Sequence, residues 1–228
     1  MSKTFASYWN LASKAVCVGR NYVAHVKELN NTVPSHPFFF LKPASAFLPL
    51  KGDVVIPGYG EDLHHEVELC VIIGRNAKDV KAKDAMDYVA GYSVSHDVSA
   101  RDWQMKKNGG QWLLGKSMDT FFPYGPYIVT KDEQIDPHNL GIRCYVNDKL
   151  VQNSNTNELV FKTKELVEYI SKFITLLPGD LISTGTPSGV GCFRNPPVFL
   201  KHGDRVRCEI DHLGVVENNM VDIGRSSL

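Results

Sequence analysis

Short apolar runs that are rich in β-branched and aromatic residues recur along the chain, and Gly, Pro, Asn or Asp bounds most of them. Such runs predict β-strands, because branched and aromatic side chains pack well on a pleated surface. The predicted strands lie at 15–19, 38–42, 53–57, 67–74, 90–97, 127–130, 141–146, 180–185 and 205–210. Hairpin turns are predicted at Asn147-Asp148 and at residues 211–214.

Helical periodicity is confined to residues 83–88, a segment after Ser99, and residues 164–177, which Pro178-Gly179 ends. Ser99 and Asp102 have the spacing of a capping box, so we expect Asp102 to cap a helix rather than bind a metal. The pattern predicts an α+β, β-rich fold with few short helices. Neither a repeat nor a linker is evident, which predicts one domain over residues 15–228 after an N-terminal segment, 1–14.

The N-terminal segment is basic and contains apolar residues at irregular helical spacing. Two interpretations remain open: a short amphipathic helix similar to a minimal mitochondrial targeting segment, or a segment that packs on the domain. The residues that would form the helix are Lys3, Phe5, Tyr8, Trp9, Leu11 and Lys14.

The composition mainly excludes certain classes of partner and location. Apolar residues make up 43% and charged residues 22% of the 228 residues, as in ordinary globular proteins. Lys plus Arg equals Asp plus Glu at 25 each, so no global field favours nucleic acid or an anionic membrane surface. The five cysteines form no Cys-x-x-Cys pair, which favours buried thiols in an intracellular, reducing compartment. No apolar run reaches the roughly 18 residues of a membrane span.

Three acidic residues form a candidate divalent-cation site. Glu66 and Glu68 lie two apart within an apolar run, and Asp97 ends another. In an extended strand both glutamates face one side, while Val67 and Leu69 face the other. Hard carboxylate oxygens suit Mg²⁺, Mn²⁺ or Ca²⁺. Taken alone, the two glutamates would instead favour a strand with one wet face, since antiparallel strands commonly alternate in this way.

His25 and Glu28 lie three residues apart, so on a helical turn they share a face. A carboxylate that orients an imidazole makes the ring a base, although a solvated helix face would give the same spacing. Lys42 and Lys116 each follow an apolar run, and a lysine there either meets an anion or extends to solvent. Arg101 could face the same cleft as Gln104 or lie on the surface.

Residues 180–191 run from a strand into a glycine-rich loop that lacks the Gly-Lys-Ser/Thr ending of a phosphate loop. It is either a plain turn or a loop whose main-chain N–H groups approach a small carboxylate.

Taken in order, these motifs resemble the fumarylacetoacetate hydrolase family. The residues that carry the resemblance are Gly19-Arg20-Asn21-Tyr22 with His25 and Glu28, Phe40-Leu41-Lys42-Pro43, His64-His65-Glu66-Val67-Glu68-Leu69, Gly91-Tyr92 through Asp97, Ala100-Arg101-Asp102, Gly115-Lys116-Ser117 with Asp119 and Pro123, and residues 184–191. The most similar branch is the short, single-domain one that holds acylpyruvases and oxaloacetate decarboxylases.

The resemblance implies a mixed β-roll or sandwich and a homodimer that binds Mg²⁺ or Mn²⁺. It implies Glu66, Glu68 and Asp97 as metal ligands and His25, Glu28 and Lys116 as catalytic residues, with the His25–Glu28 pair on a mobile lid. It also implies a small 2-oxo acid substrate and a mitochondrial location, with the cytosol as the alternative. Implied substrate contacts are Arg20, Lys42, Gln104 and Thr186, and Arg101 is a further candidate.

The implied function is cleavage of a 2-oxo acid through an enolate, as acylpyruvate hydrolysis and oxaloacetate decarboxylation. Keto–enol tautomerisation of oxaloacetate, or a related isomerisation, uses the same enolate and is the alternative. Fumarylacetoacetate is not the expected substrate, because the neighbourhood of Arg20-Asn21 lacks the further acid of fumarylacetoacetase. A non-catalytic binding protein would be expected to have lost part of this site.

Overall fold

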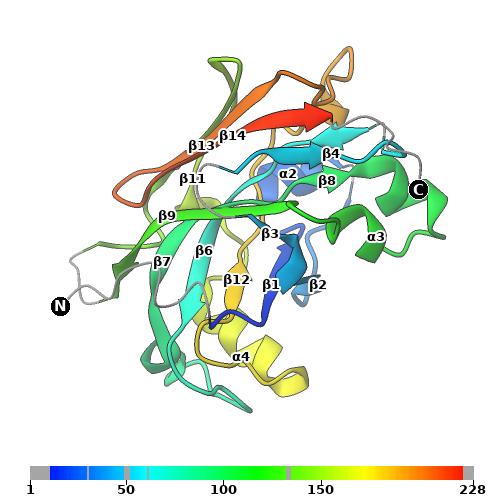
Figure 1. Cartoon of the computed structure of the whole chain (residues 1–228). Helices are drawn as coiled ribbons and strands as arrows, with labels where there is room; N and C mark the ends of the chain where they lie inside the picture. The colour runs from blue at the N-terminus through cyan, green and yellow to red at the C-terminus, as the bar shows by residue number, and fades with distance from the viewer. Residues whose placement is uncertain (1–10, 30, 49–51, 61, 132–134, 223–228) are drawn as a thin grey trace.

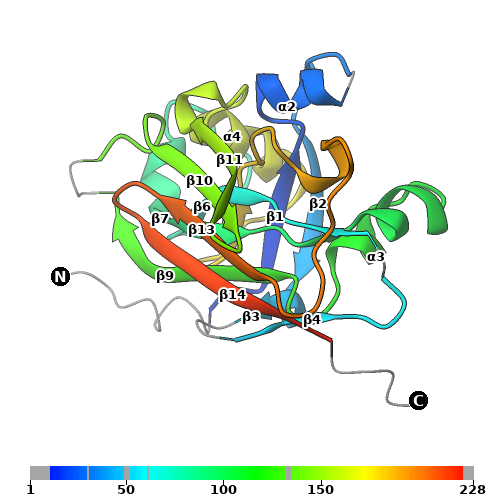
Figure 2. The ribbon, with the colours of Figure 1, turned by 90° about the horizontal axis from the view of Figure 1, so that it is seen from above.

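Two β-sheets stacked face to face enclose the main hydrophobic core of the chain (Figures 1 and 2). The structure is a computed structural model, and it describes residues 11–29, 31–48, 52–60, 62–131 and 135–222. Within these ranges no helix is both long enough and apolar enough to cross a membrane.

The larger sheet has seven strands in the order β2-β1-β12-β6-β7-β9-β3. Their bounds are β1 Lys14–Gly19, β2 Phe38–Pro43, β3 Phe47–Leu48, β6 Val67–Ile73, β7 Val89–His96, β9 Phe122–Thr130 and β12 Leu181–Ser183. Strand β12 is antiparallel to β6 and parallel to β1, so the sheet is mixed.

The second sheet has five strands in the order β11-β10-β13-β14-β4. Their bounds are β4 Val54–Ile56, β10 Gly141–Val146, β11 Lys149–Asn155, β13 Arg205–Ile210 and β14 Gly214–Asp222. A short pair joins β5 (Leu63–His64) to β8 (Ser99–Ala100).

Helices are short. They are α2 Val23–Glu28, α3 Leu113–Lys116, α4 Thr163–Phe173, a π-helix at Trp103–Lys107, and 3₁₀ turns at Ala44–Ala46, Ala85–Tyr88, Thr156–Glu158 and Gly191–Phe193.

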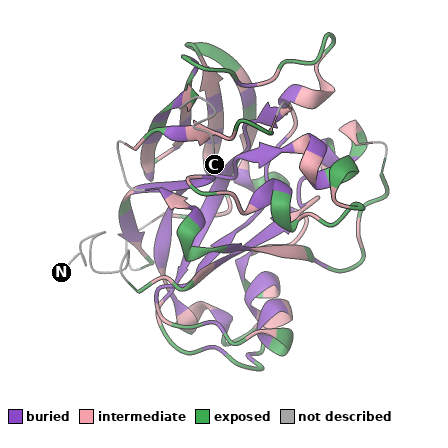
Figure 3. Cartoon of the chain, turned by 45° about the vertical axis from the view of Figure 1, so that its right-hand side comes forward, coloured by how far each residue is buried: buried purple, intermediate pink, exposed green. Residues whose placement is uncertain are grey.

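Strand β6 lies at the centre of the larger sheet and is buried on both faces (Figure 3). Val67 and Leu69 belong to the core shared with the second sheet, whereas Cys70 and Ile72 belong to a separate apolar cluster on the opposite face. Glu68 is on the Cys70 side by alternation. The predicted alternation is therefore confirmed, and the alternative of a wet face is wrong.

The β-rich fold class with few short helices is confirmed, and all nine predicted strands and both hairpin turns are present. Strands β11 and β14 were missed because polar residues interrupt their apolar alternation. The capping box at Ser99 is wrong: Ser99 lies in β8, and its hydroxyl donates to the Asp97 carbonyl at 3.0 Å. Of the proposed N-terminal helix, Leu11 lies in a turn and Lys14 in β1, while the other four residues, Lys3, Phe5, Tyr8 and Trp9, lie outside the described ranges.

Asn21 fixes the segment between β1 and α2 to two other parts of the fold. Its fully buried side chain accepts from Phe161 N (2.8 Å) and donates to the carbonyls of Phe161 (3.0 Å) and Thr184 (2.8 Å). Because these groups are buried, no water replaces the amide when it is lost.

Asn21→Leu preserves the volume but leaves one N–H and two carbonyls without a partner. We expect the free energy of unfolding to fall by about 3 kcal/mol or more, since three buried groups lose their partner and each costs about 1–3 kcal/mol. Chemical denaturation measures the loss, with exposed Asn76→Leu as the control. A loss of stability no larger than that of Asn76→Leu would contradict the role given to the Asn21 hydrogen bonds.

Candidate metal and catalytic site

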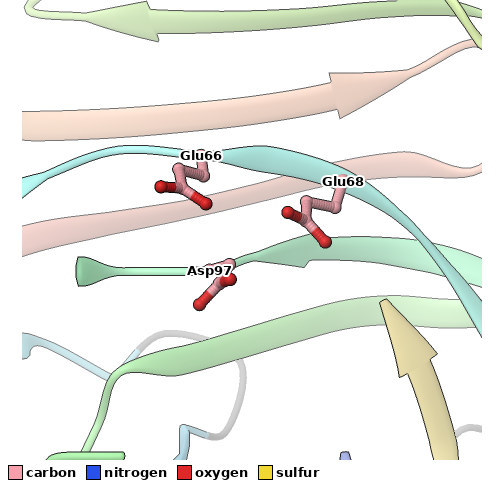
Figure 4. A group of neighbouring side chains, drawn as sticks. All are labelled: Glu66, Glu68 and Asp97. Carbon is pink, nitrogen blue, oxygen red and sulfur yellow. The ribbon is translucent and has the colours of Figure 1, made fainter. Parts of the chain in front are cut away.

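Three buried carboxylates meet at the end of the β6–β7 pair. Pairing of Val67 with His96 brings Glu66 opposite Asp97, and Asp97 N donates to the Glu66 carbonyl at 2.9 Å. Ligand atoms of Glu66, Glu68 and Asp97 all lie within 4.8 Å of one another. Figure 4 shows Glu66 and Glu68 extending from one strand toward Asp97 on the next. The strand register therefore creates the predicted triad.

Two buried lysines compensate part of this negative charge. Lys116 Nζ, at the end of α3, lies 2.8 Å from both Glu66 Oε2 and Asp97 Oδ2. Burial alone would lower the pKa of Lys116, but Asp97 and Glu66 outweigh burial and raise it. Lys42 Nζ lies 2.6 Å from Asp97 Oδ1 and donates to the carbonyls of Val98 (2.9 Å) and Phe121 (2.6 Å).

Glu68 is the least compensated member of the triad. It accepts from Ser183 Oγ at 2.6 Å and from Gly185 N at 2.9 Å, both neutral donors. Burial raises the pKa of Glu68 well above its usual value, and the charges of Asp97 and Glu66 raise it further. A divalent cation would relieve that repulsion, so the donor set and its charge fit Mg²⁺ or Mn²⁺.

The sequence also predicted the contact between His25 and Glu28. Helix α2 brings His25 Nδ1 to 2.8 Å from Glu28 Oε2, while Gly189 N donates to Glu28 Oε1 at 3.1 Å. Because Glu28 accepts from Nδ1, Nε2 carries the lone pair of the neutral ring. The phenyl ring of Phe193 packs edge-on against the imidazole.

A cavity of about 250 Å³ connects these groups. Its polar lining includes most of the residues that the sequence predicted for the site: Arg20, His25, Glu66, Glu68, Asp97, Arg101, Gln104, Lys116 and Thr186. Its apolar lining includes Phe40, Met105, Trp112 and Phe193, to which sequence reasoning gave no role in the site, because an apolar residue in a sequence does not show whether it lines a site or packs in the core.

Two arginines enter the cavity from different segments. Arg20 has a positive φ of 60° and lies over the Phe38 ring, and its buried Nε contacts no acceptor among the described residues. Arg101 donates to Gln104 Oε1 at 3.3 Å and lies over the Phe193 ring. Both guanidinium groups are placed to meet an anionic ligand.

Two predicted site residues, Glu28 and Lys42, lie outside this lining. Lys42 is not among the lining residues, and its three acceptors use the three donors of an ammonium group, so its geometry suits holding Asp97 in place. Contact between Lys42 and a substrate stays a prediction. Asp102 also lies outside the lining and pairs with Lys107 at 2.7 Å.

Gly115 lets α3 approach the segment after β8 closely enough to place Lys116. A Cβ atom at this position would lie 2.5 Å from Gln104 N and 2.7 Å from the Ala100 carbonyl oxygen. No side chain fits there without moving the main chain. This requirement was not visible in the sequence, where Gly115 is an ordinary part of an apolar run.

Three histidines beside the triad are buried and favour the neutral form. Burial lowers the pKa of His64 well below its usual value, that of His65 to about 4 and that of His96 to about 3. His64 Nδ1 lies 3.6 Å from Glu66 Oε1, so this ring lines the triad without adding positive charge at neutral pH.

Residues 14–221 match the family described as fumarylacetoacetate hydrolase C-terminal. A human protein named mitochondrial oxaloacetate tautomerase is 56% identical over 218 residues, covering 96% of this chain and 69% of that protein. A Xenopus laevis protein of the same name is 59% identical, covering 91% and 65%. The chain thus spans about two thirds of the length of these relatives.

Solved structures of similar proteins share the fold. A fumarylpyruvate hydrolase from Pseudomonas aeruginosa, in complex with Mn²⁺ and pyruvate, has a TM-score of 0.84 and 34% identity, covering 92% of this chain and 90% of that one. A 5-carboxymethyl-2-hydroxymuconate delta-isomerase from Mycobacterium smegmatis has a TM-score of 0.83 and 42% identity, covering 94% and 81%.

These comparisons correct the predicted branch. The sequence placed the chain nearest the acylpyruvases and oxaloacetate decarboxylases, yet relatives more than 50% identical are named oxaloacetate tautomerases. The error has a chemical reason. The carboxylate triad, the His25–Glu28 pair and Lys116 would serve hydrolysis, decarboxylation and tautomerisation alike, and the motifs do not specify which of these reactions follows.

Glu68→Gln should weaken Mn²⁺ binding while preserving the fold, because the amide keeps an acceptor for Ser183 and Gly185 N but removes one of three charges. Calorimetric titration with Mn²⁺ alone measures the effect, with exposed Glu217→Gln as control. Binding equal to the control would exclude Glu68 as a ligand.

Lys116→Met should change Mn²⁺ binding in the opposite direction. Its ammonium contacts oxygens of Glu66 and Asp97 that a cation would also use, so its loss makes the site more negative. We expect Mn²⁺ binding in the same titration to be at least as tight as in the parent. A clear weakening would mean that Lys116 organises the carboxylates rather than competing for them.

Proposed function

Because the chain belongs to the fumarylacetoacetate hydrolase family, we propose that it is a metal-dependent enzyme that interconverts the keto and enol forms of oxaloacetate. The observation that carries this proposal is the cavity itself, where a histidine held by Glu28 through one ring nitrogen, a buried lysine and a carboxylate triad meet. The names of the human and Xenopus relatives support the choice of reaction.

Charge around the cavity favours a dianionic substrate. Four carboxylates are matched by four cationic side chains: Glu28, Glu66, Glu68 and Asp97 against Arg20, Lys42, Arg101 and Lys116. A divalent cation then leaves two positive charges, which a 2-oxo dicarboxylate would neutralise and a monoanion would not. The volume of about 250 Å³ suits so small a molecule.

Tautomerisation requires one proton to leave C3 and one to reach the 2-oxo oxygen. His25 Nε2 is the base that accepts the C3 proton, because Glu28 holds Nδ1 and stabilises the ring when it becomes positive. The ammonium of Lys116 lies among the same carboxylates, where it stabilises negative charge that develops on oxygen. When bound, the divalent cation would act as a Lewis acid toward that oxygen, with Glu66, Glu68 and Asp97 as its ligands.

His25 can also return the proton. The imidazolium that forms lines the cavity, whose walls also include the aromatic side chains of Phe40, Trp112 and Phe193. The enol form arises when His25 Nε2 passes this proton to the 2-oxo oxygen, and the keto form arises by the reverse transfer, from that oxygen to Nε2 and then to C3. Neither step needs a hydrolytic water or loss of CO₂.

Acylpyruvate hydrolysis and oxaloacetate decarboxylation remain the second candidates. The hydrolase from Pseudomonas aeruginosa supports the first of these reactions at 34% identity. Tautomerisation has stronger support, because the relatives named for it are more than 50% identical over most of this chain.

We further propose a homodimer in mitochondria. The names of the relatives include the mitochondrial location, and a copy-to-copy interface would cover apolar side chains that the fold leaves exposed. Tyr59, Leu113 and Leu114 are 60%, 45% and 45% exposed, and Tyr59 and Leu114 line a second, apolar cavity together with Trp103.

His25→Gln should lower kcat for oxaloacetate tautomerisation by about 10²–10⁴-fold, the usual contribution of a positioned acid–base group. The assay follows the ultraviolet absorbance of the enol with and without Mn²⁺, and exposed His36→Gln serves as control. Pyruvate and CO₂ release are measured in parallel, since release faster than tautomerisation would favour oxaloacetate decarboxylation instead. A kcat within a few-fold of the control would exclude His25 as the base.

A further inference from the structure

Strand β12 stops pairing with β6 next to the carboxylate triad. Beyond that point, two side chains bond to the main chain of β6 where the main chain of β12 would otherwise do so. Main-chain pairing with β6 extends through Ser183, and Thr184 N still donates to the Leu69 carbonyl at 3.0 Å. Two residues before Leu69 in β6, the main-chain N–H and carbonyl of Val67 both bond to side chains instead. Val67 N donates to Gln152 Oε1 at 3.1 Å, and the Val67 carbonyl accepts from Thr186 Oγ1 at 3.0 Å.

The two side chains also bond to each other. Gln152 Nε2 donates to Thr186 Oγ1 at 2.8 Å and to the Pro187 carbonyl at 2.8 Å. Val67, Gln152 and Thr186 therefore form a closed ring of hydrogen bonds. Gln152 is 1% exposed and Thr186 is 4% exposed, so water cannot substitute for a missing partner.

The chemistry of each group fixes the orientation of the whole ring. A main-chain N–H can only donate, so the Gln152 oxygen faces Val67 and its NH₂ group faces Thr186 and Pro187. Thr186 Oγ1 must then accept from Gln152, which commits its single hydrogen to the Val67 carbonyl. The hydroxyl consequently has no hydrogen left to donate to an anion in the cavity.

We propose that Gln152 is a positioning residue for this site. It acts through Val67, whose main chain joins two members of the triad, Glu66 and Glu68, and through Thr186, which lines the cavity. Gln152 comes from β11 of the second sheet, so it also fixes the distance between the two sheets at the site.

The same contacts extend to the loop that follows Thr186. Gly185 N donates to Glu68 and Gly189 N donates to Glu28, on either side of the residues that Gln152 holds. At Gly189, a Cβ would lie 2.2 Å from the Val151 carbonyl oxygen, so β11 also contacts the far end of this loop. Loss of Gln152 should therefore disturb the triad and the loop together.

The test uses Gln152→Met, which matches the side-chain length without its hydrogen bonds, and Asn153→Ala, an exposed neighbour on β11, as control. Groups that orient metal ligands usually contribute about 10–100-fold to metal affinity. We expect Mn²⁺ affinity, measured with the metal alone, to fall by about tenfold or more, and KM for oxaloacetate to rise. Asn153→Ala should match the parent in both.

A double-mutant cycle with Thr186→Val separates positioning from general destabilisation. If Gln152 acts through Thr186, the double variant should lose little more Mn²⁺ affinity than either single variant. Thr186→Val keeps the side-chain volume and removes the other end of the same bond, so it provides the test alone if Gln152→Met does not fold. Full additivity in the cycle, or Mn²⁺ affinity within twofold of the parent in a folded single variant, would overturn the proposal.

This inference rests on the proposed function only for the choice of substrate. Mn²⁺ binding by the protein alone does not depend on which 2-oxo acid is converted. Absence of tautomerase activity in the parent, together with weakened Mn²⁺ binding in Gln152→Met, would reject the reaction and retain the positioning role.

Discussion

The burial of three carboxylates beside two ammonium groups is the constraint on which the site depends. Each ion removed from water costs several kcal/mol, and only close pairing and hydrogen bonds offset that cost. Lys116 contacts Glu66 and Asp97, and Lys42 contacts Asp97. Glu68 receives neutral donors instead, which leaves the cluster one positive charge short. Burial raises the pKa of Glu68, and the charges of Asp97 and Glu66 raise it further. The charge imbalance within this cluster therefore favours the binding of a cation.

The pairing of the two lysines with the carboxylates also explains why the site brings together segments that are distant in sequence. Lys42 comes from β2, an edge strand of the large sheet, and Lys116 comes from α3. The carboxylates come from β6 and from the ends of β6 and β7, at the centre of that sheet. Because each lysine bonds to more than one acceptor, small displacements of β2 or α3 would leave buried charge unmatched. The position of α3 in turn depends on Gly115, where a side chain would collide with the segment after β8.

Sequence reasoning recovered the parts of the site whose spacing follows a single element. The alternation in β6 placed Glu66 and Glu68 together, and a helical turn placed His25 beside Glu28. It failed where a role depends on contacts between elements. Lys42 gives the same apolar-run signal as Lys116, yet its ammonium is saturated by Asp97 and two carbonyls. Gln152 gave no signal, because β11 was not recognised and a single polar residue in a strand has no distinctive spacing.

The site lies where regular pairing between strands ends, and this location has a physical reason. A main-chain N–H within a ladder is used by the neighbouring strand, whereas one just beyond the ladder is available to an anion. Residues 184–190 supply such groups to Glu68 through Gly185 and to Glu28 through Gly189. The loop therefore orients a proposed metal ligand and the carboxylate that holds the proposed base. Any change that shifts this loop would move Glu68 and Glu28 together. The loop therefore links the position of the proposed metal ligand to that of His25, the proposed base that Glu28 holds.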